Sequence, residues 1–164
     1  MERPERKLPR LKEYDYSQGG AYFVTICTQD RKRILSNISV GRGLAPAVTV
    51  ELTPYGVVAQ EQLLKLEERY PSVQIDRYVI MPNHIHILIQ FVQAAGASPL
   101  PTLSDVICTY KSITTRLCRR ICPIPKLFQT SFHDHVIRGE ADYQEIAQYI
   151  VNNPAKWAED KYYL

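Results

Sequence analysis

Two consecutive strands joined by a tight turn constrain the fold of this chain most. Residues 74–80 (QIDRYVI) and 84–91 (HIHILIQF) are rich in β-branched and aromatic side chains, and the Met-Pro-Asn sequence between them is typical of a turn. We therefore predict an antiparallel strand pair. Along a strand, alternate side chains point to the same face, so Ile85, Ile87 and Ile89 share one face and require packing partners.

The segments around this pair favour a single α+β domain with helices against an antiparallel sheet. Apolar residues at helical spacing, with a Thr-Pro start or proline-marked ends, distinguish the helices from the strands. The expected strands lie at 21–27, 48–52 and 131–137, and the expected helices at 53–70, 103–122 and 140–151, followed by a short turn that ends near residue 160.

The remaining segments are predicted to be connections. Residues 1–18 are polar, basic and contain proline, so we expect a flexible arm before a single domain at 19–164. Small residues and proline at 93–101 predict a flexible connection, and residues 37–47 are expected to form a variable loop.

Basic residues are clustered although the net charge is only +3. No Asp or Glu occurs between Asp105 and Asp134, and this stretch holds Lys111, Arg116, Arg119, Arg120 and Lys126. Clustered cations without acids suit a polyanion such as nucleic acid. The same charges could instead form a solvated helix face, so composition leaves both interpretations open.

The sequence gives no sign of a membrane span or of a cysteine-based site. No apolar run approaches the ~18–20 residues that a bilayer requires, and the charged N-terminus lacks the apolar core of a signal peptide. The four cysteines form no C-x-x-C motif, and we expect them to be reduced thiols. A cytoplasmic location is therefore expected.

The candidate site begins with two histidines on the second strand of the pair. His84 and His86 share a face, so their imidazoles could bind one metal ion. On the helix at 140–151 and just after it, Tyr149 and Asn153 lie four residues apart and hence on one helix face. The Asn153 amide oxygen could be a third ligand beside a tyrosine hydroxyl. Taken alone, hydrogen-bonded histidines, a capping asparagine before Pro154 and a half-buried tyrosine are the simpler interpretation.

An ordered set of motifs resembles a known family. Residues 81–88 (MPNHIHIL) resemble the His-hydrophobic-His motif of single-tyrosine (HUH) transposases, especially the REP-associated tyrosine transposases. Similar matches in the same order occur at 22–25, 110–116, 134–138 and 149–157. The resemblance implies a ferredoxin-like or RRM-like antiparallel sheet, with His84 and His86 as metal ligands, Tyr149 as nucleophile and Asn153 in place of the polar third ligand.

The resemblance also implies an activity. Such an enzyme binds single-stranded or hairpin DNA from palindromic repeats, and it nicks and rejoins the DNA through a covalent phosphotyrosine. Imidazoles alone favour a transition metal, whereas phosphate chemistry and the resemblance favour Mg²⁺ or Mn²⁺, which we expect. The expected phosphate contacts on the helix at 103–122 are Lys111, Arg116, Arg119 and Arg120.

Several alternatives remain open from the sequence. A non-catalytic RRM-like nucleic-acid-binding module would use exposed aromatics on its sheet, but the glycine-aromatic signature of such modules is missing from this sequence. A small replication-initiator-type nicking enzyme would share the tyrosine chemistry. Tyr143 is the rival nucleophile. The DNA recognition sequence and the choice between monomer and homodimer are not determined by the sequence.

Overall fold

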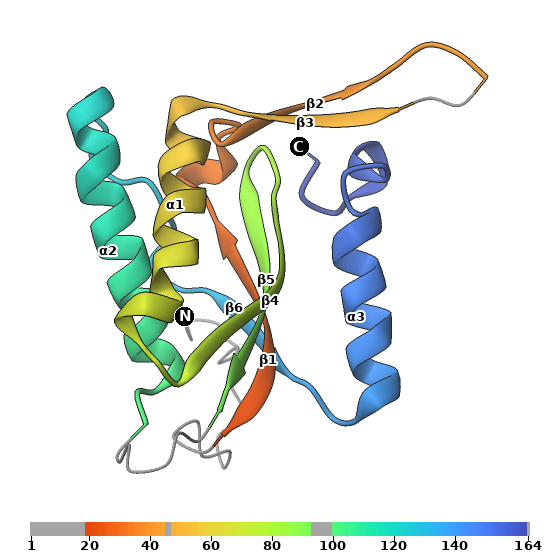
Figure 1. Ribbon diagram of the computed structural model, residues 1–164. Coiled ribbons are helices and arrows are strands. Elements are labelled where there is room, and N and C mark those ends of the chain that lie inside the picture. The colour runs from red at the N-terminus through yellow and green to blue at the C-terminus, as the bar shows by residue number, and fades with distance from the viewer. Residues whose placement is uncertain (1–18, 45–46, 93–99, 164) are drawn as a thin grey trace, which may run out of the picture.

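A four-stranded antiparallel sheet forms the centre of the protein, whose computed structural model describes residues 19–44, 47–92 and 100–163 (Figure 1). The strands lie in the order β4–β5–β1–β6, with bounds Val73–Ile80, His84–Phe91, Gly20–Cys27 and His133–Val136. Helix α1 (Pro54–Arg69) precedes β4, and α2 (Leu103–Ile121) connects β5 to β6. This strand order, with all neighbours antiparallel, confirms the predicted ferredoxin-like α+β fold.

The two faces of the sheet have different neighbours. Ile85, Ile87 and Ile89 of β5 are fully buried in the main core, together with apolar residues of α1 and α2. His84 and His86 point to the opposite face because side chains alternate along a strand. Helix α3 (Glu140–Asn152) covers that opposite face (Figure 1). The sheet therefore separates α1 and α2 from the histidines and α3.

Local sequence signals explain where the helices begin. The Thr53 side chain accepts a hydrogen bond from the Gly56 backbone N–H at 3.1 Å, and proline occupies the first helical position of α1. Helix α2 starts with a reciprocal capping box between Thr102 and Asp105. After α3, the chain turns through the 3-10 helix η2 (Trp157–Glu159), and this C-terminal turn packs against the histidine end of β5.

A two-stranded ribbon corrects one prediction. Strand β2 (Ser36–Val40) pairs with β3 (Val48–Leu52), so the strand expected at 48–52 is confirmed, but the loop expected at 37–47 is wrong in its first four residues. The glycines and proline that follow Val40 favoured a loop, although residues 37–40 alternate between polar and β-branched side chains. Backbone pairing with β3 and a Ser39–Thr49 hydroxyl contact of 2.8 Å stabilise it. The ribbon extends away from the main sheet (Figure 1).

Some expectations concern residues that the structure does not describe. The basic arm at 1–18 and most of the connection at 93–101 lie outside the described residues. The division into an arm and one domain at 19–164 therefore stays a prediction. Among the described helices, none has the length and apolarity that crossing a membrane requires.

Candidate active site

His84 and His86 lie side by side in the interior. Their ring centroids are 4.5 Å apart, and the side chains are essentially inaccessible to solvent. The Nδ1 atom of each ring has a partner at 2.8 Å, which is Asn83 Oδ1 for His84 and Thr25 Oγ1 for His86. Because an amide oxygen only accepts, His84 carries its proton on Nδ1 and keeps a lone pair on Nε2. Both Nε2 atoms are buried and make no hydrogen bond within the described residues.

The burial of the two rings also determines their charge. Desolvation lowers the pKa of His84 to about 4, although the nearby Asp160 carboxylate opposes this effect. Desolvation, followed by the proximity of His84, lowers the pKa of His86 well below its usual value. Both imidazoles are therefore neutral at pH 7. A neutral imidazole with Nδ1 held by a hydrogen bond and Nε2 available is the usual form of a metal-binding histidine.

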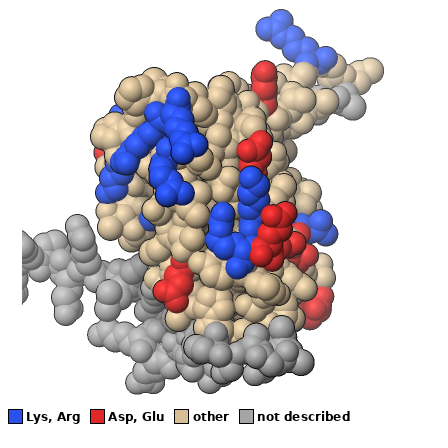
Figure 2. Space-filling model, turned by 60° about the vertical axis from the view of Figure 1, so that its left-hand side comes forward, with Lys and Arg blue, Asp and Glu red and all other residues tan. Residues whose placement is uncertain are grey.

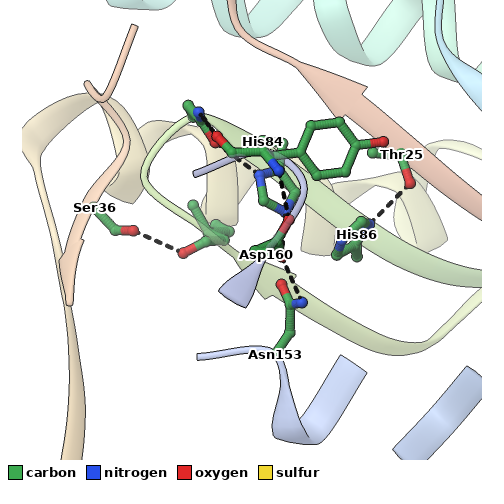
Figure 3. Close-up of polar contacts among 9 residues, drawn as sticks. Thr25, Ser36, His84, His86, Asn153 and Asp160 are labelled. Carbon is green, nitrogen blue, oxygen red and sulfur yellow. Dashed lines mark hydrogen bonds and ion pairs between the residues drawn. The ribbon is translucent and has the colours of Figure 1, made fainter. Parts of the chain in front are cut away.

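Two oxygen donors approach the histidines from the C-terminal side (Figure 3). Asp160 Oδ2 lies 3.9 Å from His84 Nε2, and the donor atoms of His84, His86 and Asp160 are all within 4.8 Å of one another. Asn153 Nδ2 donates a hydrogen bond of 2.8 Å to Asp160 Oδ2. This bond orients the Asn153 amide, whose Oδ1 is buried without a hydrogen-bond partner among the described residues. Two imidazole nitrogens, one carboxylate oxygen and one amide oxygen thus form one group of potential metal ligands.

Tyr149 lies one helical turn before Asn153 and beside His86. Its ring centroid is 5.4 Å from that of His86 and 5.9 Å from that of Phe23 on β1, and its side chain is 40% exposed. Partial burial raises the pKa of Tyr149, and so does the Asp160 carboxylate, whereas a hydrogen bond with Asn153 lowers it. The hydroxyl is therefore protonated at neutral pH.

A pocket of about 830 Å³ joins these groups between α3, β1, β5 and the C-terminal turn. His86, Tyr149, Asn153 and Asp160 all line it, whereas Tyr143, the rival nucleophile, does not. Its volume is within the ~300–1,000 Å³ that is usual for ligand sites. The structure thus brings Tyr149, His86 and Asn153 together around one space, while His84 packs against His86 and does not itself line the pocket.

Known proteins with a similar sequence or fold include transposases. No family model matches the chain. A REP-associated tyrosine transposase of Escherichia coli is 23% identical over 141 residues, which are 86% of this chain and 70% of that protein. A solved REP-associated tyrosine transposase bound to a REP hairpin has a TM-score of 0.58 and 22% identity, covering 92% of this chain and 77% of that one. This chain resembles the REP-associated tyrosine transposases in both sequence and fold.

Two further relatives extend the similarity. An uncharacterized protein of Haemophilus influenzae is 29% identical over 175 residues, covering 97% of this chain and 93% of that protein. A solved candidate transposase of Deinococcus radiodurans has a TM-score of 0.51 and 17% identity, with 87% of this chain and 97% of that chain covered. Similarity to these two proteins thus spans most of the chain.

The basic residues expected to contact DNA lie on the other side of the sheet. Figure 2 faces the side that carries α1 and α2 and shows lysine and arginine side chains gathered there. On α2, Arg116 and Arg120 are exposed. Lys111 donates hydrogen bonds to the Gln129 and Thr130 carbonyls, and burial lowers its pKa. Arg119 donates to two carbonyls of the following loop. Lys111 and Arg119 therefore also hold the chain that follows α2.

Asp160 is the site residue that the sequence did not predict. It follows Asn153 by seven residues, and the intervening Pro154 indicates only that a turn begins there. Nothing in the spacing tells that this turn folds back toward β5. The sequence offered one indication of its role: Asp160 lies three residues after the segment 149–157 that resembles the transposase family.

Proposed function

We propose that this chain is a DNA transposase that nicks and rejoins single-stranded or hairpin DNA with Tyr149 as the nucleophile and a divalent metal ion at the histidines. The observation that carries the proposal is a set of three buried polar atoms without hydrogen-bond partners among the described residues. These atoms are His84 Nε2, His86 Nε2 and Asn153 Oδ1, and the His86 ring packs against Tyr149, the only tyrosine that lines the described pocket. Buried polar atoms rarely lack a partner, and three of them gathered in one place are explained by a bound ion.

These residues fit a divalent metal ion. His84 and His86 would supply two nitrogens, and Asn153 and Asp160 would supply oxygens. Carboxylate and amide oxygens suit Mg²⁺ and Mn²⁺, and the two imidazoles make Mn²⁺ the better match of the pair. When bound, such an ion would neutralise charge that develops on the scissile phosphate.

The chemical step would be a transesterification at phosphorus. The Tyr149 oxygen attacks the phosphate, the bond from phosphorus to the 3′-oxygen breaks, and a phosphotyrosine linkage forms. The phenolic proton leaves to solvent, and the departing 3′-oxygen gains a proton. Because the phosphodiester is exchanged and not hydrolysed, a 3′-hydroxyl can reverse the step and join a strand. The direct test is a covalent protein–DNA adduct, seen on a denaturing gel after incubation with single-stranded DNA and Mg²⁺ or Mn²⁺.

The Asp160 carboxylate is expected to strengthen metal binding. It lies next to His84 Nε2 and also orients the Asn153 amide. Asp160→Asn removes the charge but keeps an oxygen that can accept from Asn153. We expect Mn²⁺ affinity, measured by calorimetry, to fall by roughly 10- to 100-fold, because the substitution keeps an oxygen that can face the metal and removes only its negative charge.

Asp142→Asn is the matched control for this substitution, since Asp142 also lines the pocket but pairs with His135. The control should bind Mn²⁺ as the wild type does. Equal affinity in Asp160→Asn and in the wild type would exclude Asp160 from the metal site.

Four basic residues of α2 are expected to contact the DNA backbone: Lys111, Arg116, Arg119 and Arg120. Arg116→Ala and Arg120→Ala are the cleaner tests, because Lys111 and Arg119 also bind backbone carbonyls. Each variant should weaken hairpin binding and lower the slope of log K against log salt by about 0.7–0.9. If affinity and slope both stay at wild-type values, these arginines are surface charges that do not touch DNA.

A further inference from the structure

A second group of basic and aromatic side chains lies next to the site, on the C-terminal turn and on the loop after β1. The Arg33 guanidinium carbon is 4.5 Å from the Tyr163 ring centroid and 5.4 Å from that of Trp157. Two more cations flank the neighbouring ring, with Arg31 at 5.7 Å and Lys161 at 5.1 Å from the centre of Tyr162. We name Arg31, Arg33, Lys161 and Tyr163 the loop–turn surface; the three cations are exposed, and Tyr163 is 42% exposed.

The loop–turn surface is continuous with the metal ligands. The Tyr163 ring packs on Trp157 at 5.1 Å, and Trp157 lies 6.0 Å from the ring of His84. Tyr162, which lies between the surface and the site, is 4.4 Å from the same histidine ring. Unlike the basic face of α2, this surface therefore lies on the α3 side of the sheet, where a strand could reach both it and Tyr149.

The loop that carries the arginines has an unusual backbone. Asp30 and Arg31 have φ angles of 56° and 53°, so two consecutive residues other than glycine occupy the left-handed region. Their surroundings hold them there: the Thr28 hydroxyl donates to the Lys32 carbonyl at 2.8 Å, and the Gln29 N–H donates to the Leu127 carbonyl at 2.8 Å. Strain of this kind persists where the surrounding structure enforces it, and it gathers at ligand-binding segments.

We propose that the loop–turn surface binds the single-stranded part of the DNA next to the cleaved phosphate. Unpaired bases would stack on Tyr163 and on the Arg33 guanidinium plane, and the charges of Arg31, Arg33 and Lys161 would neutralise neighbouring phosphates. Cations combined with exposed aromatic faces are the usual means of holding single-stranded nucleic acid without reading its sequence. The proposal rests on the proposed function for the identity of the ligand, and on the ring and cation geometry for its position.

Binding can be measured without the reaction by using a Tyr149→Phe background. Anisotropy of a labelled oligothymidylate gives the affinity, and fluorescence of Trp157, the sole tryptophan, reports whether the strand reaches this surface. We expect quenching of Trp157 in the background protein. Tyr163→Ala should weaken binding by about tenfold or more, whereas Tyr163→Phe, which keeps the ring, should bind nearly as well as the background protein.

Arg33 separates stacking from charge. Arg33→Ala should weaken binding and lower the salt slope by about 0.7. Arg33→Lys should restore the slope but not the full affinity, since lysine lacks a planar stacking face. Arg69→Ala, an exposed arginine at the end of α1 on the other side of the sheet, is the control and should match the background protein.

The structural alternative is that Arg33 only ties the C-terminal turn to the loop. In that case Arg33→Ala and Tyr163→Ala would lower the melting temperature but bind oligothymidylate with unchanged affinity, and the proposal would be overturned. Lack of oligothymidylate binding by the background protein would overturn it as well. The proposed function stands or falls separately, on adduct formation by the wild-type protein.

Discussion

Tyr149→Phe is expected to abolish the covalent protein–DNA adduct while leaving hairpin binding nearly unchanged. The substitution removes one oxygen from a half-exposed ring and keeps the ring contacts with His86 and Phe23. Without the hydroxyl no phosphotyrosine can form, so nicking should fall by roughly 10⁴-fold or more, as in other enzymes that lose their nucleophile. Denaturing gels measure the adduct, and gel shift with hairpin DNA measures binding.

Two other tyrosines serve as controls for this result. Tyr143→Phe changes the rival on the same helix, whose side chain does not line the described pocket. Tyr162→Phe changes the ring that packs on His84, where burial raises the pKa of the hydroxyl to about 12. Both controls should still form the adduct. Normal nicking by Tyr149→Phe in Mg²⁺, or loss of the adduct in Tyr143→Phe alone, would contradict the assignment of the nucleophile.

Replacing one histidine of the pair is expected to lower both the affinity for the metal ion and the formation of the adduct. His86→Gln retains a polar side chain of similar size but loses the imidazole nitrogen that has no hydrogen-bond partner among the described residues. Since a direct ligand matters more than an orienting partner, Mn²⁺ affinity should fall by more than about 100-fold, and adduct formation should fall with it. Calorimetry measures the affinity. Chelation of the metal should likewise stop adduct formation by the wild-type protein, and added Mn²⁺ should restore it.

His133→Ala is the matched control, because His133 lies exposed at the start of β6 and does not line the pocket. It should bind Mn²⁺ and react as the wild type does. Circular dichroism and melting temperature establish that His86→Gln is folded. A folded His86→Gln protein that still forms the adduct in Mg²⁺ would rule out the metal site at this position.

The sequence predicted the parts of the site that depend on local periodicity. Strand alternation placed His84 and His86 on one face opposite Ile85 and Ile87, and the structure has this arrangement. Helical spacing placed Tyr149 and Asn153 one turn apart. These relations are fixed by the geometry of a single element, so they can be derived without knowing the rest of the fold.

Relations between elements could not be derived in the same way. Asp160 reaches the histidines only because the C-terminal turn folds back over β5, which no periodicity encodes. The ribbon strand β2 is stabilised by pairing with β3 and not by a long pattern of its own. The cation contacts of Arg33 with Tyr163 join residues 130 positions apart, and only tertiary structure brings these two side chains together.

The separation of α2 from the pocket by the sheet bears on the length of DNA that the protein would engage. A DNA strand bound in the pocket can reach Arg116 and Arg120 by passing around an edge of the sheet. The edge strands are β4 and β6. A short oligonucleotide can occupy the pocket without meeting these arginines, whereas longer DNA can occupy both places. Under the proposed function, binding affinity and its dependence on salt would therefore increase abruptly with DNA length. The increase would occur at the length that first extends around the sheet edge.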